Sequence, residues 1–214
     1  MRYLITGASG GIGRALVSQL APAHDVVAVS RSLSSVPPGA SALVLDLADP
    51  ASWQLPSFDR LDGLVHCAGV VRPGRVDSQD AADWTAQLAV NAVGPALLTS
   101  LLLPALRAAR GAVVFVNSGS GQRARAGMTS YGASKFALRA LADGLREEEP
   151  SLRVTSVFPG RTATAMQSVV RAYEGGPFEP ARYLRPETVA GVIAQVLATP
   201  ADAVVPEVVV RPRG

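Results

Sequence analysis

Short runs of apolar residues alternate with longer stretches of helical periodicity along most of this chain. The short runs predict β-strands at Arg2–Thr6, Val26–Ser30, Ala42–Asp46, Gly63–Cys67, Ala112–Asn117, Arg153–Phe158 and Glu207–Val210. The longer stretches predict helices at Ile12–Leu20, Asp80–Ala109, Ser130–Glu148 and Pro186–Ala198. This alternation is typical of βαβ units, in which each helix connects two parallel strands.

The predicted strands are mostly continuous in apolar residues, so helices should cover both faces of the sheet. Right-handed connections then give an α/β fold: a doubly wound, seven-stranded parallel sheet flanked by helices on both faces. We expect a single domain over residues 1–214. The segment Ala165–Arg185 contains Gly175, Gly176, Pro177 and Pro180, and we interpret it as a short, loose substrate-binding loop that forms a lid.

Composition narrows the class of protein. Hydrophobic residues make up 48% of the chain but aromatic ones only 5%, so the core should be aliphatic. A net charge of +3 would suit nucleic acid, yet the arginines are scattered and no stacking aromatic cluster accompanies them. The single cysteine, Cys67, excludes an internal disulfide and ends an apolar run, which favours a buried core thiol. We expect neither nucleic acid nor a metal as a ligand.

The location of the protein is predicted from the same features. Met1–Thr6 leads directly into a structural motif, so we expect no signal peptide. The apolar stretch Ala96–Leu106 is too short for a bilayer and is interrupted by Pro104. A cytoplasmic protein without a membrane partner is therefore the expectation.

A glycine-rich segment, Thr6-Gly7-Ala8-Ser9-Gly10-Gly11-Ile12-Gly13, lies between the first strand and the first helix. Glycines permit a sharp turn and a close approach to a pyrophosphate, and N–H groups at the start of a helix bind anions. A plain tight turn is the alternative. Because strand, loop and helix coincide, the segment predicts dinucleotide binding by Gly7, Ser9, Gly10, Gly11, Ile12 and Gly13 in a Rossmann-type fold.

The end of the second strand indicates which dinucleotide is bound. An acidic residue there would hold the ribose 2′-hydroxyl of NAD, but the chain has Ser30 and Arg31, which suit the 2′-phosphate of NADP. An ordinary solvated arginine is the alternative. Asp46 and Leu47 follow the third strand and should face the adenine, although an aspartate here is also common in turns.

Lys135 is the only lysine, against nineteen arginines, and it follows Tyr131 by four residues. On a helix this spacing puts the ammonium beside the phenol. A cation there would lower the pKa of the tyrosine below about 10 and let it exchange protons near neutral pH. A surface pair on an amphipathic helix is the alternative interpretation.

Taken together, the motifs resemble the short-chain dehydrogenase/reductase family. The matching residues are the glycine loop, Cys67-Ala68-Gly69, Asn91, Ser118, Tyr131 with Lys135, and Pro159-Gly160, and Ser118 precedes Tyr131 by the thirteen positions typical of the family. The resemblance extends over almost the whole chain. It implies an enzyme that interconverts a carbonyl and an alcohol by hydride transfer.

The resemblance also implies a role for each catalytic residue. Ser118 would hold the substrate carbonyl, Tyr131 would act as general acid or base, and Lys135 would bind the nicotinamide ribose and lower the tyrosine pKa. Asn91 would anchor a water that extends the proton path. Two alternatives stay open: Ser120 lies close to Ser118 in the sequence, and Asn91 alone would be read as a helix defect or a local hydrogen bond.

The remaining cofactor contacts are implied in the same way. Cys67, Ala68 and Gly69 would lie at the cofactor, and Pro159, Gly160, Thr162 and Thr164 would grip the nicotinamide carboxamide, Thr162 through its backbone N–H. The chain departs from the family at His66-Cys67, where Asn-Asn is usual. His66 is either a core histidine bonded to backbone, which we favour, or a titrating group near the cofactor. Gly10 stands where NADP-preferring members often have a basic residue.

We therefore expect an NADP(H)-dependent oxidoreductase that prefers NADP(H) over NAD(H). A non-catalytic NADP(H) sensor is the alternative, although it would usually lack the tyrosine or the lysine; a nucleotide-sugar epimerase would need a further domain. The chain is short for the family in its substrate loop, which implies an open site or a contribution from a neighbouring subunit. We expect a homodimer or homotetramer formed through Asp80–Ala109 and Ser130–Glu148.

The substrate is a small molecule whose identity the sequence leaves open. Apolar residues of the lid suggest an apolar pocket: Met166, Val169, Val170, Tyr173, Phe178 and Tyr183. Arg171 and Arg182 in the same segment would suit an anionic substrate.

Overall fold

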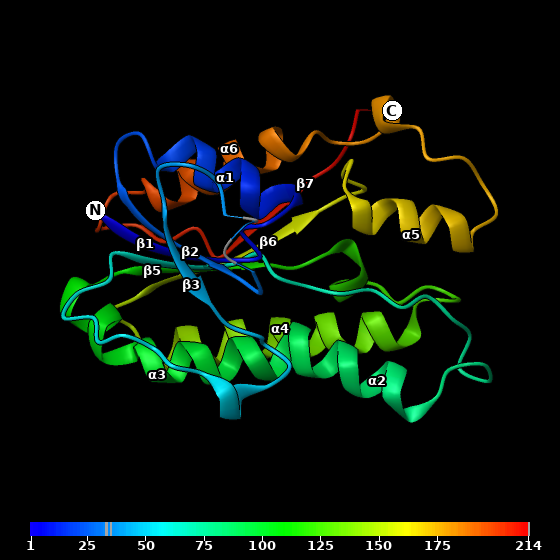
Figure 1. Cartoon of the computed structure of the whole chain (residues 1–214), viewed down its shortest axis with the longest axis horizontal. Helices are drawn as coiled ribbons and strands as arrows, with labels where there is room; N and C mark the ends of the chain where they lie inside the picture. Colours follow the sequence, from blue (N-terminus) through cyan, green and yellow to red (C-terminus); the bar gives the residue numbers. More distant parts are fainter. Residues whose placement is uncertain (33, 35, 214) are drawn as a thin grey trace.

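A seven-stranded parallel sheet forms the centre of the computed structural model, which describes residues 1–32, 34 and 36–213 (Figure 1). Its strands are β1 (Arg2–Thr6), β2 (Asp25–Ser30), β3 (Ser41–Val44), β4 (Gly63–His66), β5 (Ala112–Val116), β6 (Arg153–Pro159) and β7 (Glu207–Val210). They lie in the order β3-β2-β1-β4-β5-β6-β7 and every neighbouring pair is parallel. The predicted fold class is confirmed. The order reverses beside β1, where ligands bind in such sheets.

Helices cover both faces of the sheet (Figure 1). On one face lie α1 (Gly11–Leu20) and α6 (Pro186–Leu197); on the other lie α2 (Ala81–Leu88), α3 (Gly94–Ala109) and α4 (Thr129–Glu148). Successive strand residues point to opposite faces, so Leu4 packs in the core beneath α3 and α4 whereas Ile5 packs in the core beneath α1 and α6. The central strands are buried on both sides, while β3 and β7 at the edges are partly exposed.

The predicted helix Asp80–Ala109 is three consecutive segments. Asp80 caps α2 by accepting a hydrogen bond from the Asp83 N–H, and a π-helical turn, η3 (Ala89–Val93), separates α2 from α3. Helix α3 runs through Pro104, as the predicted helix does, and buried neighbours such as Leu102 and Leu106 hold it against the sheet. The run Ala81–Ala109 has the length and composition to cross a membrane, and its inner side packs on the sheet.

The prediction of a loose segment over Ala165–Arg185 is wrong in its first half, where the structure has helix α5 (Ala165–Tyr173). The Thr164 side chain caps this helix by accepting from the Gln167 N–H. Met166, Val169, Val170 and Tyr173 also follow helical spacing, a pattern that the nearby glycines and prolines obscured. Beyond α5 the chain returns through a short 3₁₀ turn, η5 (Pro180–Arg182), to α6.

Candidate active site

The carboxyl ends of the strands open into a cavity of about 840 Å³. Thr6, Ser30, Cys67, Asn117 and Pro159, each at or just after a strand end, contribute to its wall. Its size is in the range of pockets that bind organic ligands. Nearly all of the predicted site residues line it: Gly7, Ser9, Gly10, Gly11, Ile12, Ser30, Arg31, Asp46, Leu47, Cys67, Ala68, Gly69, Ser118, Tyr131, Lys135, Pro159, Gly160, Thr162 and Thr164. Gly13 and Asn91 lie behind the wall.

The glycine loop is shaped by close backbone contacts. Gly7 has φ +67°, and a Cβ added to Gly13 would lie 2.3 Å from the Gly7 carbonyl oxygen, so the first turn of α1 needs glycine at both positions. Gly10 precedes the helix without a side-chain cap, which leaves the start of α1 directed at the cavity. Backbone N–H groups in this arrangement bind a phosphate. The loop therefore fits the pyrophosphate of a dinucleotide.

The residues after β2 and β3 form another part of the cavity wall. Ser30 is buried and its hydroxyl accepts from the Ser32 N–H at 3.3 Å, whereas Arg31 is exposed. The Asp46 carboxylate accepts from the Ala48 N–H at 2.9 Å, which is the turn chemistry that the sequence left as an alternative. Both this turn and Arg31 border the cavity.

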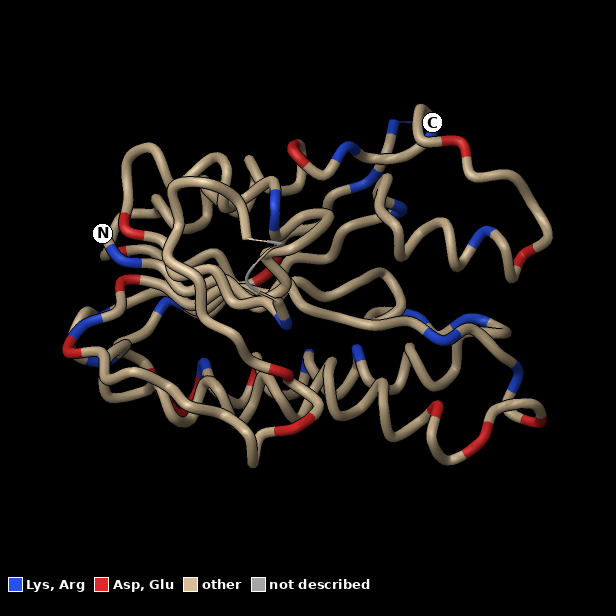
Figure 2. Tube along the Cα trace, viewed as in Figure 1, with Lys and Arg blue, Asp and Glu red and all other residues tan. Residues whose placement is uncertain are grey.

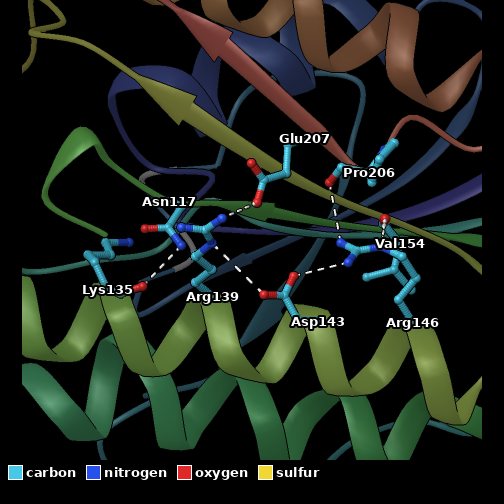
Figure 3. Close-up of polar contacts among 8 residues, drawn as sticks. All are labelled: Asn117, Lys135, Arg139, Asp143, Arg146, Val154, Pro206 and Glu207. Carbon is cyan, nitrogen blue, oxygen red and sulfur yellow. Dashed lines mark hydrogen bonds and ion pairs between the residues drawn. The ribbon is translucent and has the colours of Figure 1, made fainter. Parts of the chain in front are cut away.

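Helix α4 carries Tyr131 and Lys135, and side chains clamp it to the sheet (Figure 3). The Asn117 amide donates to the Lys135 backbone oxygen at 3.1 Å, directly after β5. Arg139 donates to the Glu207 carboxylate of β7 at 2.9 Å, and Arg146 reaches backbone carbonyls in β6 and just before β7. These contacts fix the turn of α4 that faces the cavity.

Tyr131, Ser118 and Lys135 come together at this turn. The Ser118 hydroxyl lies within hydrogen-bonding reach of the Tyr131 phenol, and the Lys135 ammonium lies 5.9 Å from the centre of the phenol ring. That ammonium donates to the Val116 carbonyl at 3.0 Å. Tyr131 and Lys135 are both buried. A proton donor, a second hydroxyl and a cation therefore share one corner of the cavity.

The expected lowering of the Tyr131 pKa is wrong for this structure. Burial raises the pKa of the phenol, and the hydrogen bond with Ser118 opposes that rise only in part. Burial also lowers the pKa of Lys135 to about 8. The sequence shows the pairing of phenol and ammonium but not how deeply both groups are buried, and burial decides the direction here.

The sequence left two serines, Ser118 and Ser120, as candidates for the hydroxyl group beside Tyr131. Both line the cavity, but the phenol is within reach of the Ser118 hydroxyl, which also accepts from the Ser120 N–H at 3.1 Å. The contact of Ser120 with Ser118 uses its backbone and not its side chain. The geometry thus favours Ser118, as the spacing predicted.

Asn91 lies in the π-helical turn and is fully buried. Its side-chain oxygen accepts from the Val70 N–H at 2.8 Å, and its amide donates to the Val70 carbonyl and to the Ser134 hydroxyl, both at 2.9 Å. One turn earlier, Gln87 donates to Ser130 at 2.7 Å. The side chain of Asn91 therefore joins a cavity loop to α4, and its role in holding a water stays a prediction.

His66 and Cys67 mark the departure from the usual family motif. His66 is a buried core residue, but its Nε2 contacts the Thr99 hydroxyl at 2.9 Å, so the predicted backbone partner is wrong. Its ring stacks on Phe115, and burial lowers its pKa to about 3. Burial raises the pKa of the Cys67 thiol to about 12, so this thiol is unreactive at neutral pH.

The segment after β6 ties α5 to the cavity. The Thr162 hydroxyl donates to the Gly160 carbonyl at 3.0 Å, and Arg161 forms two hydrogen bonds of 2.8 and 2.6 Å with Glu174 after the end of α5. Of the six apolar lid residues proposed from the sequence, Met166 and Val170 line the cavity; Val169, Tyr173, Phe178 and Tyr183 do not. The lid is therefore an ordered helix with only part of its apolar face toward the site.

Several wall residues had no signal in the sequence. Arg123 and Arg125 follow Ser118 in the same connection, and Arg211 comes from the segment after β7. The Arg211 guanidinium donates to the Phe158 carbonyl at 2.6 Å and to the Gln122 side chain at 3.0 Å. Only the packing of β7 against β6 brings this arginine to the site.

Comparisons with known proteins agree on a single protein family. The family model described as short chain dehydrogenase matches residues 2–175. The 2,3-dihydro-2,3-dihydroxybenzoate dehydrogenase of Escherichia coli K12 is 35% identical over 173 residues, covering 76% of this chain and 70% of its own. The 3-oxoacyl-[acyl-carrier-protein] reductase of Synechocystis is 31% identical over 224 residues, covering 94% and 90%.

Solved structures are similar over nearly the full length. A short chain dehydrogenase from Escherichia coli CFT073, complexed with NADPH, has a TM-score of 0.85 at 26% identity and covers 99% of this chain and 96% of its own. An alcohol dehydrogenase from Thermococcus sibiricus, complexed with 5-hydroxy-NADP, has a TM-score of 0.88 at 24% identity, covering 99% and 96%. At 24% identity, the similarity to the alcohol dehydrogenase shows a shared fold and nothing further.

Proposed function

This chain belongs to the short-chain dehydrogenase/reductase family and is an oxidoreductase, and from that premise we propose that it is an NADP(H)-dependent enzyme that interconverts a carbonyl and an alcohol. The observation that carries the proposal is that the buried Tyr131 and Lys135 lie with Ser118 at one corner of the cavity. A sensor without turnover has no need of this arrangement.

The residues present fit a nicotinamide dinucleotide. We assign the pyrophosphate to the glycine loop at the start of α1, the adenosine end to Arg31 and Asp46, and the nicotinamide end to Lys135 and Thr164, all of which line one cavity. When bound, such a cofactor supplies or accepts a hydride. The chain itself binds the cofactor, orients the substrate and moves the proton.

The proton chemistry follows from the positions of the hydroxyl groups. Ser118 donates a hydrogen bond to the carbonyl oxygen of the substrate and Tyr131 donates the proton that completes the alcohol; in the reverse direction the phenolate accepts it. A raised pKa keeps Tyr131 protonated at neutral pH and so ready to act as the acid. Lys135 adds positive charge where negative charge develops on oxygen.

Replacing Arg31 with aspartate should reverse the cofactor preference. Charge-assisted contacts to a phosphate contribute roughly 1.5–3 kcal/mol, so the unmodified protein should bind NADPH about ten-fold to a hundred-fold more tightly than NADH. Aspartate would repel the 2′-phosphate and accept from the 2′-hydroxyl. Fluorescence titration of both proteins with NADPH and NADH measures the four dissociation constants.

The matched control for that titration is Arg185→Asp, an equal charge change at an exposed arginine outside the cavity, just before α6. It should leave the ratio of the two affinities unchanged. Equal affinities of the unmodified protein for NADPH and NADH would contradict the assignment of Arg31.

We propose a homodimer or homotetramer in solution. On the outer face of the α3 and α4 layer, Val93, Leu97, Leu101 and Phe136 are exposed although they are large and apolar. A second copy of the chain would bury them.

Light scattering at micromolar concentration should give at least twice the 22.1 kDa of one chain, and Leu101→Glu should shift the protein toward a monomer. Val76→Glu, on an exposed loop, is the control; a monomeric unmodified protein would contradict the proposal.

We further propose that the chain is one domain and acts in the cytoplasm. All seven strands belong to the same sheet, and helices on both of its faces pack on that sheet. The lone cysteine forms no disulfide within the chain, which fits a reducing compartment.

A further inference from the structure

The wall of the cavity carries more positive than negative charge. Its cationic side chains are Arg31, Arg123, Arg125, Lys135, Arg161 and Arg211, and its carboxylates are Asp46 and Glu174. The dinucleotide assigned above accounts for Arg31 at its adenosine end and Lys135 at its nicotinamide end. The remaining cations are therefore candidates for binding a second ligand, the substrate, in the cavity.

Two of the four remaining cations already have a partner in the protein. Arg161 pairs with Glu174, which Arg171 shares, and Arg211 donates to the Phe158 carbonyl and the Gln122 side chain. Arg123 and Arg125 differ: over residues 1–32, 34 and 36–213, no carboxylate lies within ion-pair distance of either, and both are exposed. Two guanidinium groups are thus available at the wall.

Their place in the chain puts them at the substrate end. Arg123 and Arg125 lie in the connection between β5 and α4, which begins at Ser118 and leads to Tyr131. Figure 2 shows blue stretches in this connection, which leads from β5 to α4. The Gly127 carbonyl in the same connection accepts from the Gly74 N–H at 2.8 Å, which fixes it to the loop after β4. The two arginines therefore lie on the cavity wall, in the connection that links Ser118 to α4.

Apolar side chains also line the cavity at this end, beside polar ones such as Gln122 and Gln167. Val70, Met128, Met166 and Val170 line the cavity, and α5 approaches the rim where Tyr173 lies against Gly127. Gly127 has φ +72° and has no room for a Cβ beside that ring. An apolar passage with two guanidinium groups at its mouth matches a molecule that has a carbon skeleton and an anionic end.

The arginines that the sequence proposed for an anion are occupied. Arg171 pairs with Glu174, and Arg182 pairs with Glu179 at 2.8 Å. Neither lines the cavity. The candidates for binding a negatively charged group are therefore the arginines in the connection after Ser118 and not those of the lid.

We propose that Arg123 and Arg125 bind the carboxylate of a keto acid or hydroxy acid substrate while its carbonyl or alcohol group lies at Ser118 and Tyr131. A guanidinium offers two parallel N–H donors that match both oxygens of a carboxylate, and its charge is not lost at any physiological pH. This inference rests on the proposed function, because it assigns the substrate class to the same site.

The test compares keto acids with their methyl esters. Levulinate, its longer straight-chain homologues and the corresponding esters serve as substrates for the unmodified protein, Arg123→Gln, Arg125→Gln and the double variant. The unmodified protein should prefer each acid, and each single variant should lower kcat/KM for the acid by about ten-fold to a hundred-fold while leaving the ester unchanged. Arg60→Gln removes an equal charge outside the cavity and should change neither.

Binding provides a second readout that needs no turnover. Calorimetry with hexanoate, an acid without a reactive carbonyl, should show binding to the NADP⁺-loaded protein that weakens in both arginine variants and with rising salt. If the protein reduces the esters but shows no preference for acids that depends on these arginines, the keto acid assignment is overturned and the proposed function stands. If hexanoate binds through the arginines but no carbonyl compound is reduced, the anion site is supported and the proposed function fails.

Discussion

Tyr131→Phe should lower turnover by roughly 10²–10⁴-fold, the usual contribution of a positioned acid or base. The substitution removes one oxygen atom and keeps the ring beneath the Lys135 ammonium. The Tyr131 carbonyl still accepts from the Ser134 hydroxyl, so the turn of α4 is preserved. We expect normal cofactor affinity, a normal circular dichroism spectrum and a selective loss of kcat.

The matched control is Tyr3→Phe, which removes a phenol oxygen from another buried tyrosine. Tyr3 lies in β1 outside the cavity, where its hydroxyl contacts the sulfur of Met1. Its variant should retain full activity. Steady-state kinetics with one reduced substrate measures both proteins, and full activity of Tyr131→Phe would refute the mechanism whatever the cofactor data showed.

Ser118→Ala is expected to have the second largest effect, a loss of rate of roughly 10²–10³-fold through removal of one donor to the carbonyl oxygen. The same change removes the hydrogen bond that opposes the rise in the Tyr131 pKa, so the pKa of the phenol should rise further. In the oxidation direction, which needs the phenolate, the pH profile should therefore shift upward.

Ser120→Ala distinguishes this role from a general effect on the turn. Ser120 contributes its backbone N–H to the Ser118 hydroxyl, and alanine keeps that N–H. Its kcat and pH profile should match those of the unmodified enzyme. Equal losses in the two variants would assign the effect to the η4 turn (Gly119–Gly121) and would remove Ser118 from the proton chemistry.

The parts of the fold with strong local signals could be predicted from the sequence. Mostly continuous apolar runs indicated the strands, because a parallel strand buried on both faces is rich in apolar residues. The glycine loop was equally clear, since the close approach of Gly13 to the Gly7 carbonyl excludes any side chain. The exposed edge strand β3 fits this reasoning least, because its apolar residues face solvent on part of their surface.

Features that depend on tertiary packing could not be predicted in this way. The helix predicted as one segment over Asp80–Ala109 is divided by the π-helical turn η3, and no local signal in the sequence marks that division. Helix α5 was hidden by the glycines and prolines that follow it. The direction of the Tyr131 pKa depends on burial, which no spacing reports.

The residues of the candidate site also fall into two groups: those that local motifs identify and those that only the folded chain brings together. Motifs identified Ser118, Tyr131 and Lys135, because the chemistry requires these groups at fixed spacing along one connection and one helix. Arg211 reaches the cavity from the far end of the chain, and no local pattern links it to Gln122. Whether Arg123 and Arg125 are free or paired is likewise a property of the folded protein alone.

The central claim is that hydride passes between the bound cofactor and a substrate carbon with Tyr131 supplying the proton. The most direct measurement incubates the protein with NADPH that carries deuterium at C4 of the nicotinamide and with a panel of ketones, quinones, β-keto thioesters and keto acids, followed by mass spectrometry of the products. The account predicts a deuterated alcohol from at least one carbonyl compound, formed by the unmodified protein and far more slowly by Tyr131→Phe. Tight binding of NADPH without transfer of deuterium to any carbonyl compound would contradict it.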